Sequence, residues 1–202
     1  ITDFMVKICN VNKNSVVLDM TCGSGSFLVR AMTQALSDCH TKAEEDEVKK
    51  YHIYGVEYDE LVYGLATTNM LIHGDGNSNL VQGSCFEEVP HFIADGVRFN
   101  VVLMNPPYNA MAKQVPKDYA KTWGNSKQDP SKGLFFVKFI LSQMNEKSMQ
   151  GKLAVLLPMA CAIGNSTLMK QMKTAILKNN TLDAVFSLPD DVFYPGASAC
   201  AC

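Results

Sequence analysis

The stretch Val16-Val-Leu-Asp-Met-Thr-Cys-Gly-Ser-Gly-Ser-Phe27 decides the fold of this 202-residue chain. Its apolar start is typical of a short buried strand, and the apolar residues that follow it recur at helical spacing. Between strand and helix, Gly23 and Gly25 form a turn that a ligand can approach closely, because glycine has no Cβ and tolerates positive φ. The order of strand, glycine turn and helix predicts a cradle for a nucleoside or nucleotide.

Two familiar nucleotide-binding motifs do not match this turn. A dinucleotide fingerprint needs a third glycine at position 28, where the chain has Leu28, so NAD and FAD fit poorly. A P-loop needs Gly-Lys-Ser/Thr after the turn, and no such sequence follows.

The next predicted strand, His52-Ile-Tyr-Gly-Val-Glu57, ends in a carboxylate. An acid at the tip of the second strand of a nucleotide-binding fold accepts hydrogen bonds from ribose hydroxyls. We therefore predict that Glu57 is a ribose ligand. The alternative is a solvated acid at a strand end.

A third motif, Asn105-Pro106-Pro107-Tyr108, follows the apolar run Phe99-Asn-Val-Val-Leu-Met104. Two successive prolines stiffen the path of the chain and bias Asn105 toward an extended conformation. An amide oxygen, a main-chain carbonyl and an aromatic ring are then presented at the carboxyl end of a strand, where open α/β sheets bind ligands. This arrangement suits a planar, nucleobase-like amine. The alternative is a Pro-Pro turn that closes a buried strand.

Along the rest of the chain, strand patterns alternate with helical patterns. Strands are predicted at about 15–20, 52–57, 78–82, 99–104, 152–157 and 182–187, and helices at about 26–37, 59–72, 133–147 and 165–178. This alternation predicts an α/β fold with a mostly parallel sheet and helices on both faces. Residues 41–50 are predicted to be a solvated helix end or loop. The polar segment 109–133, with five lysines, Tyr119 and Trp123, is either a surface for phosphates and bases or a disordered loop.

Composition limits the class of protein further. A hydrophobic content of 47% supports one sizeable core, and no Pro/Gly/Ser linker interrupts the chain, so residues 1–202 are predicted to form one domain. The seven cysteines include no Cys-x-x-Cys pair. We therefore expect neither a zinc site, nor any other metal site, nor a disulfide framework, and we expect a reducing cytoplasm. The net charge of −2 is not that of a self-sufficient DNA-binding domain.

In their order along the chain, the motifs resemble S-adenosylmethionine-dependent N6-adenine DNA methyltransferases of the gamma arrangement. The motifs are Asp19-Met-Thr-Cys-Gly-Ser-Gly25, Glu57, Gly83-Ser-Cys-Phe86 and Asn105-Pro-Pro-Tyr108. Within that family, the chain is most similar to the modification (M) subunit of type I restriction-modification systems. That narrower resemblance rests on Gly151-Lys-Leu-Ala-Val-Leu-Leu-Pro158 and on Ala184-Val-Phe-Ser-Leu-Pro-Asp-Asp-Val-Phe-Tyr-Pro-Gly-Ala-Ser198. It implies a Rossmann-like class I methyltransferase fold and methyl transfer to the N6 amine of adenine in DNA.

The same resemblance assigns residues to the cofactor, S-adenosyl-L-methionine. Its methionine and ribose portions would lie along the glycine turn, at Asp19, Thr21, Gly23, Ser24 and Gly25. Glu57 would accept bonds from the ribose hydroxyls, and Tyr58 would lie against the adenine ring. Family members commonly have an acid in the third motif, where this chain has Ser84. The cofactor adenine is therefore expected to depend on packing against Cys85 and Phe86.

The resemblance also assigns the residues that would handle the target base. The Asn105 side-chain oxygen and the Pro106 carbonyl would accept the two N–H bonds of the target amine, with Pro107 stiffening the turn. Tyr108 would stack on the flipped base, and Phe193 would stack on its opposite side. The alternative for Phe193 is a core anchor beneath a turn.

Partners and rival functions follow from the same comparison. Double-stranded DNA, a specificity subunit and a restriction subunit are the expected partners, with no membrane. The chain has no starting Met, lacks the upstream Thr-Pro segment and helical domain of family members, and stops at Ala199-Cys-Ala-Cys202 in what should be a new strand, so we expect both ends to be truncated. The rivals are a methyltransferase acting on glutamine amides of proteins, an RNA guanine methyltransferase, and a cofactor-binding module without catalysis.

Overall fold

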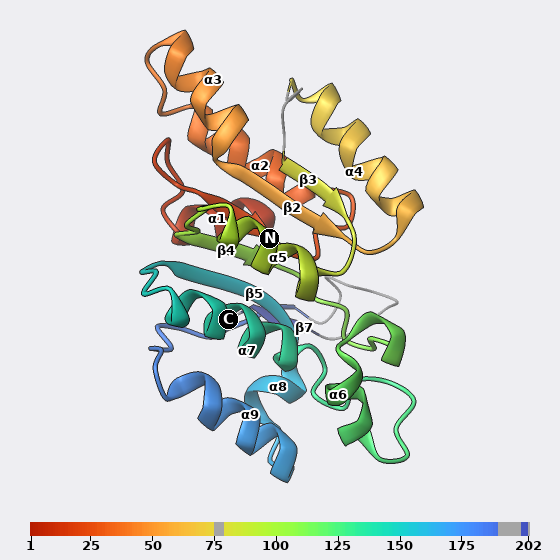
Figure 1. Cartoon of the computed structure of the whole chain (residues 1–202). Coiled ribbons are helices and arrows are strands. Elements are labelled where there is room, and N and C mark those ends of the chain that lie inside the picture. The colour runs from red at the N-terminus through yellow and green to blue at the C-terminus, as the bar shows by residue number, and fades with distance from the viewer. Residues whose placement is uncertain (75–78, 190–198, 202) are drawn as a thin grey trace. The chain divides into compact units, whose positions relative to one another are not determined.

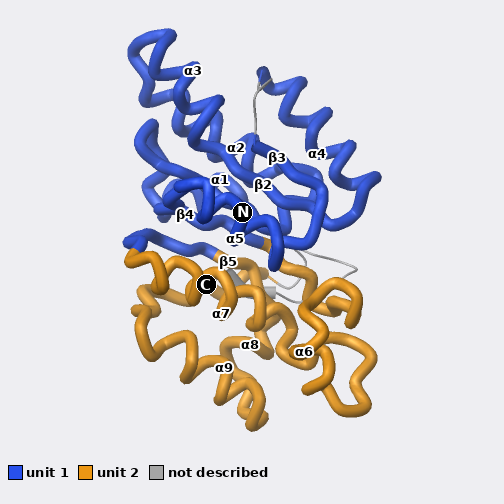
Figure 2. Tube along the Cα trace, viewed as in Figure 1, with its two compact units in different colours: residues 1–104, 149–154 blue, residues 105–148, 155–202 orange. Residues whose placement is uncertain are grey.

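The structure is a computed structural model that describes residues 1–74, 79–189 and 199–201. The chain divides into two compact units, residues 1–104 with 149–154, and residues 105–148 with 155–202 (Figure 2). The prediction of a single domain over residues 1–202 stays a prediction. No helix in the described ranges is long and apolar enough to cross a membrane.

The first unit is built on four parallel strands (Figure 1). They are β1 (Val17–Asp19), β2 (Ile53–Glu57), β3 (Asn79–Gln82) and β4 (Val101–Met104), in the order β3-β2-β1-β4. Leu18 lies opposite Tyr54 and Val102, and Gly55 lies opposite Leu80. Since the strands run the same way, the carboxyl ends of β1, β2 and β3 lie along one edge. The predicted parallel α/β arrangement is confirmed.

Five helices accompany these strands. They are α1 (Thr2–Ile8), α2 (Ser26–Leu36), α3 (Lys42–Tyr51), α4 (Glu60–Ile72) and α5 (Cys85–Ala94). A Cβ on Gly55 would meet Leu28 of α2 at 2.5 Å, so α2 packs directly on this strand. The neighbouring Tyr54 instead makes edge contacts with Phe92 of α5 and with Phe99. Because successive residues of a strand point to opposite faces, α2 and α5 cover opposite faces of the sheet.

The second unit contains short elements followed by longer helices. Residues 109–133 include η1 (Ala112–Gln114), α6 (Lys117–Ala120) and η2 (Lys121–Trp123). Then come α7 (Leu134–Glu146), α8 (Met159–Ile163) and α9 (Thr167–Leu177). The strand β5 (Lys152–Pro158) begins in the first unit and ends in the second, where it pairs antiparallel with β7 (Ala199–Ala201). The strand β6 (Phe186–Ser187) also pairs antiparallel with β7.

Three predicted elements need correction. Residues 41–50 are a full helix, because Thr41 and Glu44 form a capping box at its start. The strand predicted at 182–187 is restricted to its last two residues, and β5, β7 and β6 pair antiparallel. The segment 109–133 is neither a disordered loop nor an irregular one, since it forms helical turns around the buried side chains of Val115, Tyr119, Trp123 and Asp129.

Candidate active site

The glycine turn follows β1 and leads into α2, as the sequence predicts. Gly23 and Gly25 have φ angles of 54° and 78°, which side-chain-bearing residues rarely adopt. Gly25 is the N-cap of α2 and donates its own N–H to the Cys22 carbonyl at 2.8 Å. No side chain caps α2, so its first N–H groups remain directed toward the turn. The site of a Cβ on Gly23 faces open space, which a ligand can occupy.

Glu57 holds this turn in place from the end of β2. Its Oε2 atom accepts a hydrogen bond from the Gly23 N–H at 2.9 Å, and its Oε1 atom accepts one from the Asp59 N–H at 2.8 Å. Each carboxylate oxygen has a second lone pair, which remains suited to a hydroxyl donor. Glu57 therefore lies beside the glycine turn, and its role toward ribose stays a prediction.

Asp19 lies beneath the turn and is 1% exposed. Its Oδ1 atom accepts a hydrogen bond from the Thr21 N–H at 3.1 Å. Burial, with a smaller contribution from the nearby Glu57 charge, raises the pKa of the Asp19 carboxyl to about 8, against the lowering effect of the bond from the Thr21 N–H. Asp19 therefore supports the turn from inside as a neutral acid over most of the physiological pH range.

Thr21 carries an unsatisfied polar atom at the turn. Among the described residues, its Oγ1 atom is buried and has no hydrogen-bond partner. A buried hydroxyl without a partner is costly in a folded protein, and a polar ligand at the turn would satisfy it. Together with the open space over Gly23, this orphaned hydroxyl fits the binding of a small polar cofactor such as S-adenosylmethionine.

The loops after β2 and β3 complete this edge of the sheet. The Gly83 N–H donates to the Glu57 carbonyl at 2.9 Å, and the Gln82 side chain donates to the Tyr58 carbonyl at 3.0 Å. Tyr58 is 39% exposed, which leaves its ring accessible to a ligand. These contacts bring the predicted second and third motifs together at the turn.

Ser84, Cys85 and Phe86 differ in how accessible they are. Ser84 is the N-cap of α5, and its side chain makes no capping bond. Cys85 is buried, and burial raises the pKa of its thiol above the ordinary range. Phe86 is half-buried. Contact of these residues with the cofactor adenine stays a prediction.

Asn69 is a site residue that sequence reasoning missed. It lies in α4, and its side-chain amide donates to the Ser24 carbonyl at 2.9 Å. This bond holds the glycine turn at Ser24, next to the Gly23 N–H that Glu57 binds. An isolated asparagine inside an apolar helical pattern gives no signal of such a contact, because the partner is 45 residues away in sequence.

The tetrapeptide Asn105–Tyr108 belongs to the second unit and directly follows β4 along the chain. Asn105 is exposed, Pro106 is buried, and Pro107 and Tyr108 are half-buried. The Tyr108 hydroxyl donates to Asn105 Oδ1 at 2.8 Å. The amide oxygen that would accept the target amine is thus already held in a defined position by its own motif.

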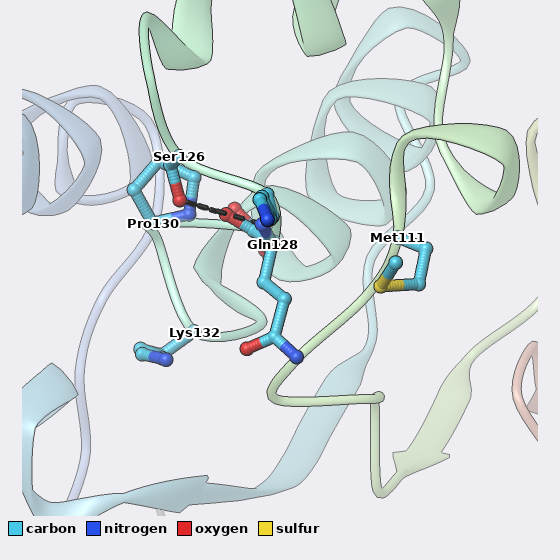
Figure 3. Close-up of a pocket in the computed structure, with 7 residues that line it drawn as sticks. Met111, Ser126, Gln128, Pro130 and Lys132 are labelled. Carbon is cyan, nitrogen blue, oxygen red and sulfur yellow. Dashed lines mark hydrogen bonds between the residues drawn. The ribbon is translucent and has the colours of Figure 1, made fainter.

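The segment 109–133 forms a cavity of about 440 Å³ (Figure 3). Its lining residues are Met111, Ser126, Lys127, Gln128, Asp129, Pro130 and Lys132. Tyr119 and Trp123, considered as base contacts, are instead 9% and 7% exposed. They pack edge-on against each other, and Tyr119 stacks on Phe135 with ring centroids 3.5 Å apart. Their rings therefore belong to the core of this unit.

Two sequence predictions remain, the role of Phe193 and the expectation of no metal site. Phe193 lies in residues 190–198, outside the described residues, so its role against the target base stays a prediction. Within the described ranges, no group of three or more His, Cys, Asp or Glu side chains is arranged to hold a metal ion.

Comparison with known proteins agrees with the resemblance seen in the motifs. The family model described as N-6 DNA Methylase matches residues 1–202. The type II restriction enzyme and methyltransferase RM.BcgI of Heyndrickxia coagulans is 32% identical over 194 residues, which are 96% of this chain and 28% of that protein. The type I restriction enzyme EcoEI methylase subunit of Escherichia coli is 26% identical over 204 residues, covering 96% of this chain and 38% of that subunit.

A solved structure shows the same fold. The type I restriction-modification system methyltransferase subunit from Streptococcus thermophilus superposes with a TM-score of 0.69 and 23% identity. The match covers 99% of this chain and 42% of that one. The chain therefore spans less than half the length of each of these three relatives.

The contacts of Glu57 generate a first prediction. In Glu57→Gln, the amide can accept at only one of the two positions, so the affinity for S-adenosylmethionine should fall by about 1–3 kcal/mol. Isothermal titration calorimetry measures this loss. Glu60→Gln, exposed in the first turn of α4, is the matched control and should bind as wild type. Equal affinity of wild type and Glu57→Gln would refute the ribose assignment.

The buried Asp19 generates a second prediction. Its pKa rises from 3.8 in an ordinary carboxyl to about 8 in the folded chain. Ionisation in that pH window therefore favours the unfolded state, and the free energy of unfolding should fall as pH rises from about 4 to about 8. Asp19→Asn keeps the acceptor for the Thr21 N–H but cannot ionise, so it should lose this component of the pH dependence.

Urea denaturation at a series of pH values measures the effect. The difference in stability between Asp19→Asn and wild type should favour the variant more at high pH than at low pH. Asp95→Asn, an exposed substitution at the end of α5, should show no comparable trend. A difference for Asp19→Asn that does not change with pH would mean that the carboxyl ionises normally.

Proposed function

Because this chain belongs to the N-6 DNA methylase family, we propose that it transfers a methyl group from S-adenosylmethionine to the N6 amine of adenine in DNA. The observation that carries the proposal is the exposed Asn105 amide, held by the Tyr108 hydroxyl at 2.8 Å and followed by the buried Pro106. Asn105 Oδ1 and the Pro106 carbonyl form a pair of acceptors that suits the two N–H groups of a planar aromatic amine.

The cofactor would lie on the glycine turn of the first unit. Glu57 supplies acceptors for the ribose hydroxyls, Thr21 supplies a hydroxyl that has no partner in the part of the chain that the structure describes, and Tyr58 supplies an accessible ring. When bound, S-adenosylmethionine supplies an activated methyl group on a sulfonium. No charged group of the chain is needed to make that methyl electrophilic.

Asn105 and Pro106 would bind and activate the target amine. The exocyclic nitrogen of adenine is a poor nucleophile, because its lone pair is delocalised into the ring. Accepting both of its N–H bonds, at Asn105 Oδ1 and at the Pro106 carbonyl, stabilises the positive charge that develops on nitrogen during attack. The methyl group would pass from the sulfonium to this nitrogen, which would then lose one proton to solvent water.

The target adenine must leave the helical stack to reach these groups. Unstacking and unpairing cost a few kcal/mol. The half-buried Tyr108 offers a ring against which the extruded base can stack. The Tyr108 hydroxyl meanwhile occupies one lone pair of Asn105 Oδ1 and leaves the other for the amine.

Recognition of a particular DNA sequence is assigned to other parts of the protein or to partners. The net charge of −2 gives little overall attraction for phosphates. A local positive excess does exist in residues 109–133, which contain five lysines and two aspartates. We assign non-specific contact with the backbone to this segment, and sequence specificity to a separate subunit or domain of the kind found in restriction-modification systems.

Methyl transfer from labelled S-adenosylmethionine to DNA, RNA and protein tests the proposed function. It should be measured on the full-length protein with any specificity subunit present. Asn105→Ala should reduce transfer to adenine by about 100- to 1000-fold while cofactor affinity stays the same, because Asn105 binds only the target amine. Tyr108→Phe keeps the ring and should lose far less.

The exposed Asn125→Ala, in the same unit, is the matched control and should methylate as wild type. Normal adenine methylation by Asn105→Ala would refute the catalytic assignment. Label in protein or RNA rather than DNA would select one of the rival enzymes. Cofactor binding with no label transferred would select a non-catalytic module.

The charge distribution generates a prediction about DNA binding. Fluorescence anisotropy with duplex DNA should show weak binding by this chain that falls steeply between about 50 and 200 mM salt, because released counterions supply most of the affinity. Replacing Lys117 and Lys127 together by Gln should reduce the salt dependence. Lys42→Gln, in the charged helix α3, should not. Tight, sequence-selective binding at physiological salt would instead indicate a self-contained methyltransferase.

A further inference from the structure

Asp129 is a buried side chain of the second unit whose carboxylate is bonded at both oxygens. It is 0% exposed, and its carboxylate accepts four hydrogen bonds. Oδ1 accepts from the Tyr119 hydroxyl at 2.6 Å and from the Ser131 N–H at 2.8 Å. Oδ2 accepts from the Ser131 hydroxyl at 2.9 Å and from the Gly133 N–H at 3.1 Å. A carboxylate with four donors is a rigid junction between the segments that supply them.

The backbone of Asp129 extends this junction to the segment that follows the Asn105–Tyr108 tetrapeptide. The Asp129 N–H donates to the Ala110 carbonyl at 2.8 Å. Ala110 is buried and lies two residues after Tyr108. The tetrapeptide is therefore fixed at its carboxyl end by the same residue that fixes α6 and the start of α7.

At the carboxyl end of the same segment, just before α7, the backbone of Lys132 and Gly133 is left-handed. Lys132 and Gly133 have consecutive φ angles of 55° and 98°. Lys132 is one of few residues with a side chain that adopt this left-handed conformation, which is strained. The Lys132 N–H donates to the Asp129 carbonyl at 3.3 Å, and the Gly133 N–H donates to its carboxylate. Asp129 thus holds the strained pair in place.

The strained pair in turn contacts the tetrapeptide. A Cβ on Gly133 would lie 3.0 Å from Pro106 Cγ, so the glycine backbone packs directly against the proline ring. The Lys132 ammonium donates to Asn109 Oδ1 at 2.9 Å, one residue past Tyr108. Bonds from Asp129 therefore reach the motif along two paths, one through Gly133 to Pro106 and one through Ala110.

We infer that Asp129 is a positioning residue that fixes the Pro106 carbonyl and the Asn105 amide in the geometry needed to bind the target amine. The inference rests on the proposed function, because it assigns those two acceptors to adenine. Misplacement of a reacting group by about 1 Å costs about 100-fold in rate, and supporting hydrogen bonds prevent such misplacement. If Asp129 served stability alone, the fold would not need Lys132 in a left-handed conformation or the Gly133 backbone packed against the Pro106 ring.

The decisive variant is Asp129→Asn in the full-length protein. Asparagine has nearly the same shape, but an N–H group replaces one of the two oxygens. Each oxygen accepts from a backbone N–H, Ser131 at Oδ1 and Gly133 at Oδ2, so one of these backbone bonds is lost in either orientation of the amide. We expect kcat for adenine methylation to fall about 10- to 100-fold, with the affinity for S-adenosylmethionine unchanged and KM for DNA changed less than about threefold. An equal fall in cofactor affinity or a normal kcat would overturn the inference.

Tyr119→Phe is the matched control. It removes one bond to the same carboxylate, at Oδ1, but leaves the bonds to Ser131 and Gly133. Its kcat should stay within about threefold of wild type, even if its melting temperature falls as much as that of Asp129→Asn. A kcat loss in Tyr119→Phe equal to that in Asp129→Asn would mean that stability, and not position, explains the effect.

If Asp129→Asn does not fold, Gly133→Ala tests the path from Gly133 to Pro106. It leaves Asp129 intact and places a methyl group against the Pro106 ring. The same loss of kcat with unchanged cofactor affinity is expected, and a normal kcat would overturn the path through Pro106.

Hydrogen–deuterium exchange of residues 108–110 separates this inference from the proposed function. Exchange there should be faster in Asp129→Asn than in wild type or Tyr119→Phe, whatever the substrate is. If wild type transfers no methyl group to DNA, the proposed function fails. Unchanged exchange in Asp129→Asn would independently refute the positioning role of Asp129.

Discussion

The hydrogen bond from the Gly23 N–H to the Glu57 carboxylate, 2.9 Å long, is the contact on which the geometry of the glycine turn depends. Gly23 has a left-handed φ, and a turn with such freedom needs an external restraint. Glu57 provides it from the end of the neighbouring parallel strand. Because the other carboxylate oxygen binds the Asp59 N–H, a single acid fixes the exit of β1 and the entry to α4 relative to each other.

Two buried aspartates show how differently a fold can treat the same group. Asp129 receives four hydrogen bonds, which compensate the loss of water around its carboxylate. Asp19 receives a bond from Thr21 and lies near the Glu57 charge, so burial dominates and its pKa rises to about 8. The first acid organises the backbone around it, whereas the second avoids the cost of burial by staying protonated.

The sequence predicts most reliably what depends on local pattern. The strand, glycine turn and helix around Gly23, and the acid at Glu57, were predictable because each lies at the end of an apolar run. The helix α5 was not predicted, because Pro90 lies inside it. The full helix α3 was not predicted either, although its capping box, Thr41 and Glu44, can be read from the sequence. The roles of Asn69 and Asp129 were not predictable, because their partners are brought to them only by tertiary structure. The burial of Tyr119 and Trp123 was not predictable either, because their neighbours in the sequence are polar and only tertiary packing buries the two rings.

Each half of the proposed chemistry is held by a carboxylate, and the physical reason lies in the donors that converge there. Left-handed turns at Gly23 and Gly133 direct backbone N–H groups inward. An amide side chain presents one acceptor and one donor, so its N–H would face another N–H at such a point. A carboxylate presents two oxygens and no donor, and its charge strengthens each bond it accepts. Glu57 and Asp129 are therefore the residues that hold left-handed turns in place beside groups that must not move during the proposed reaction.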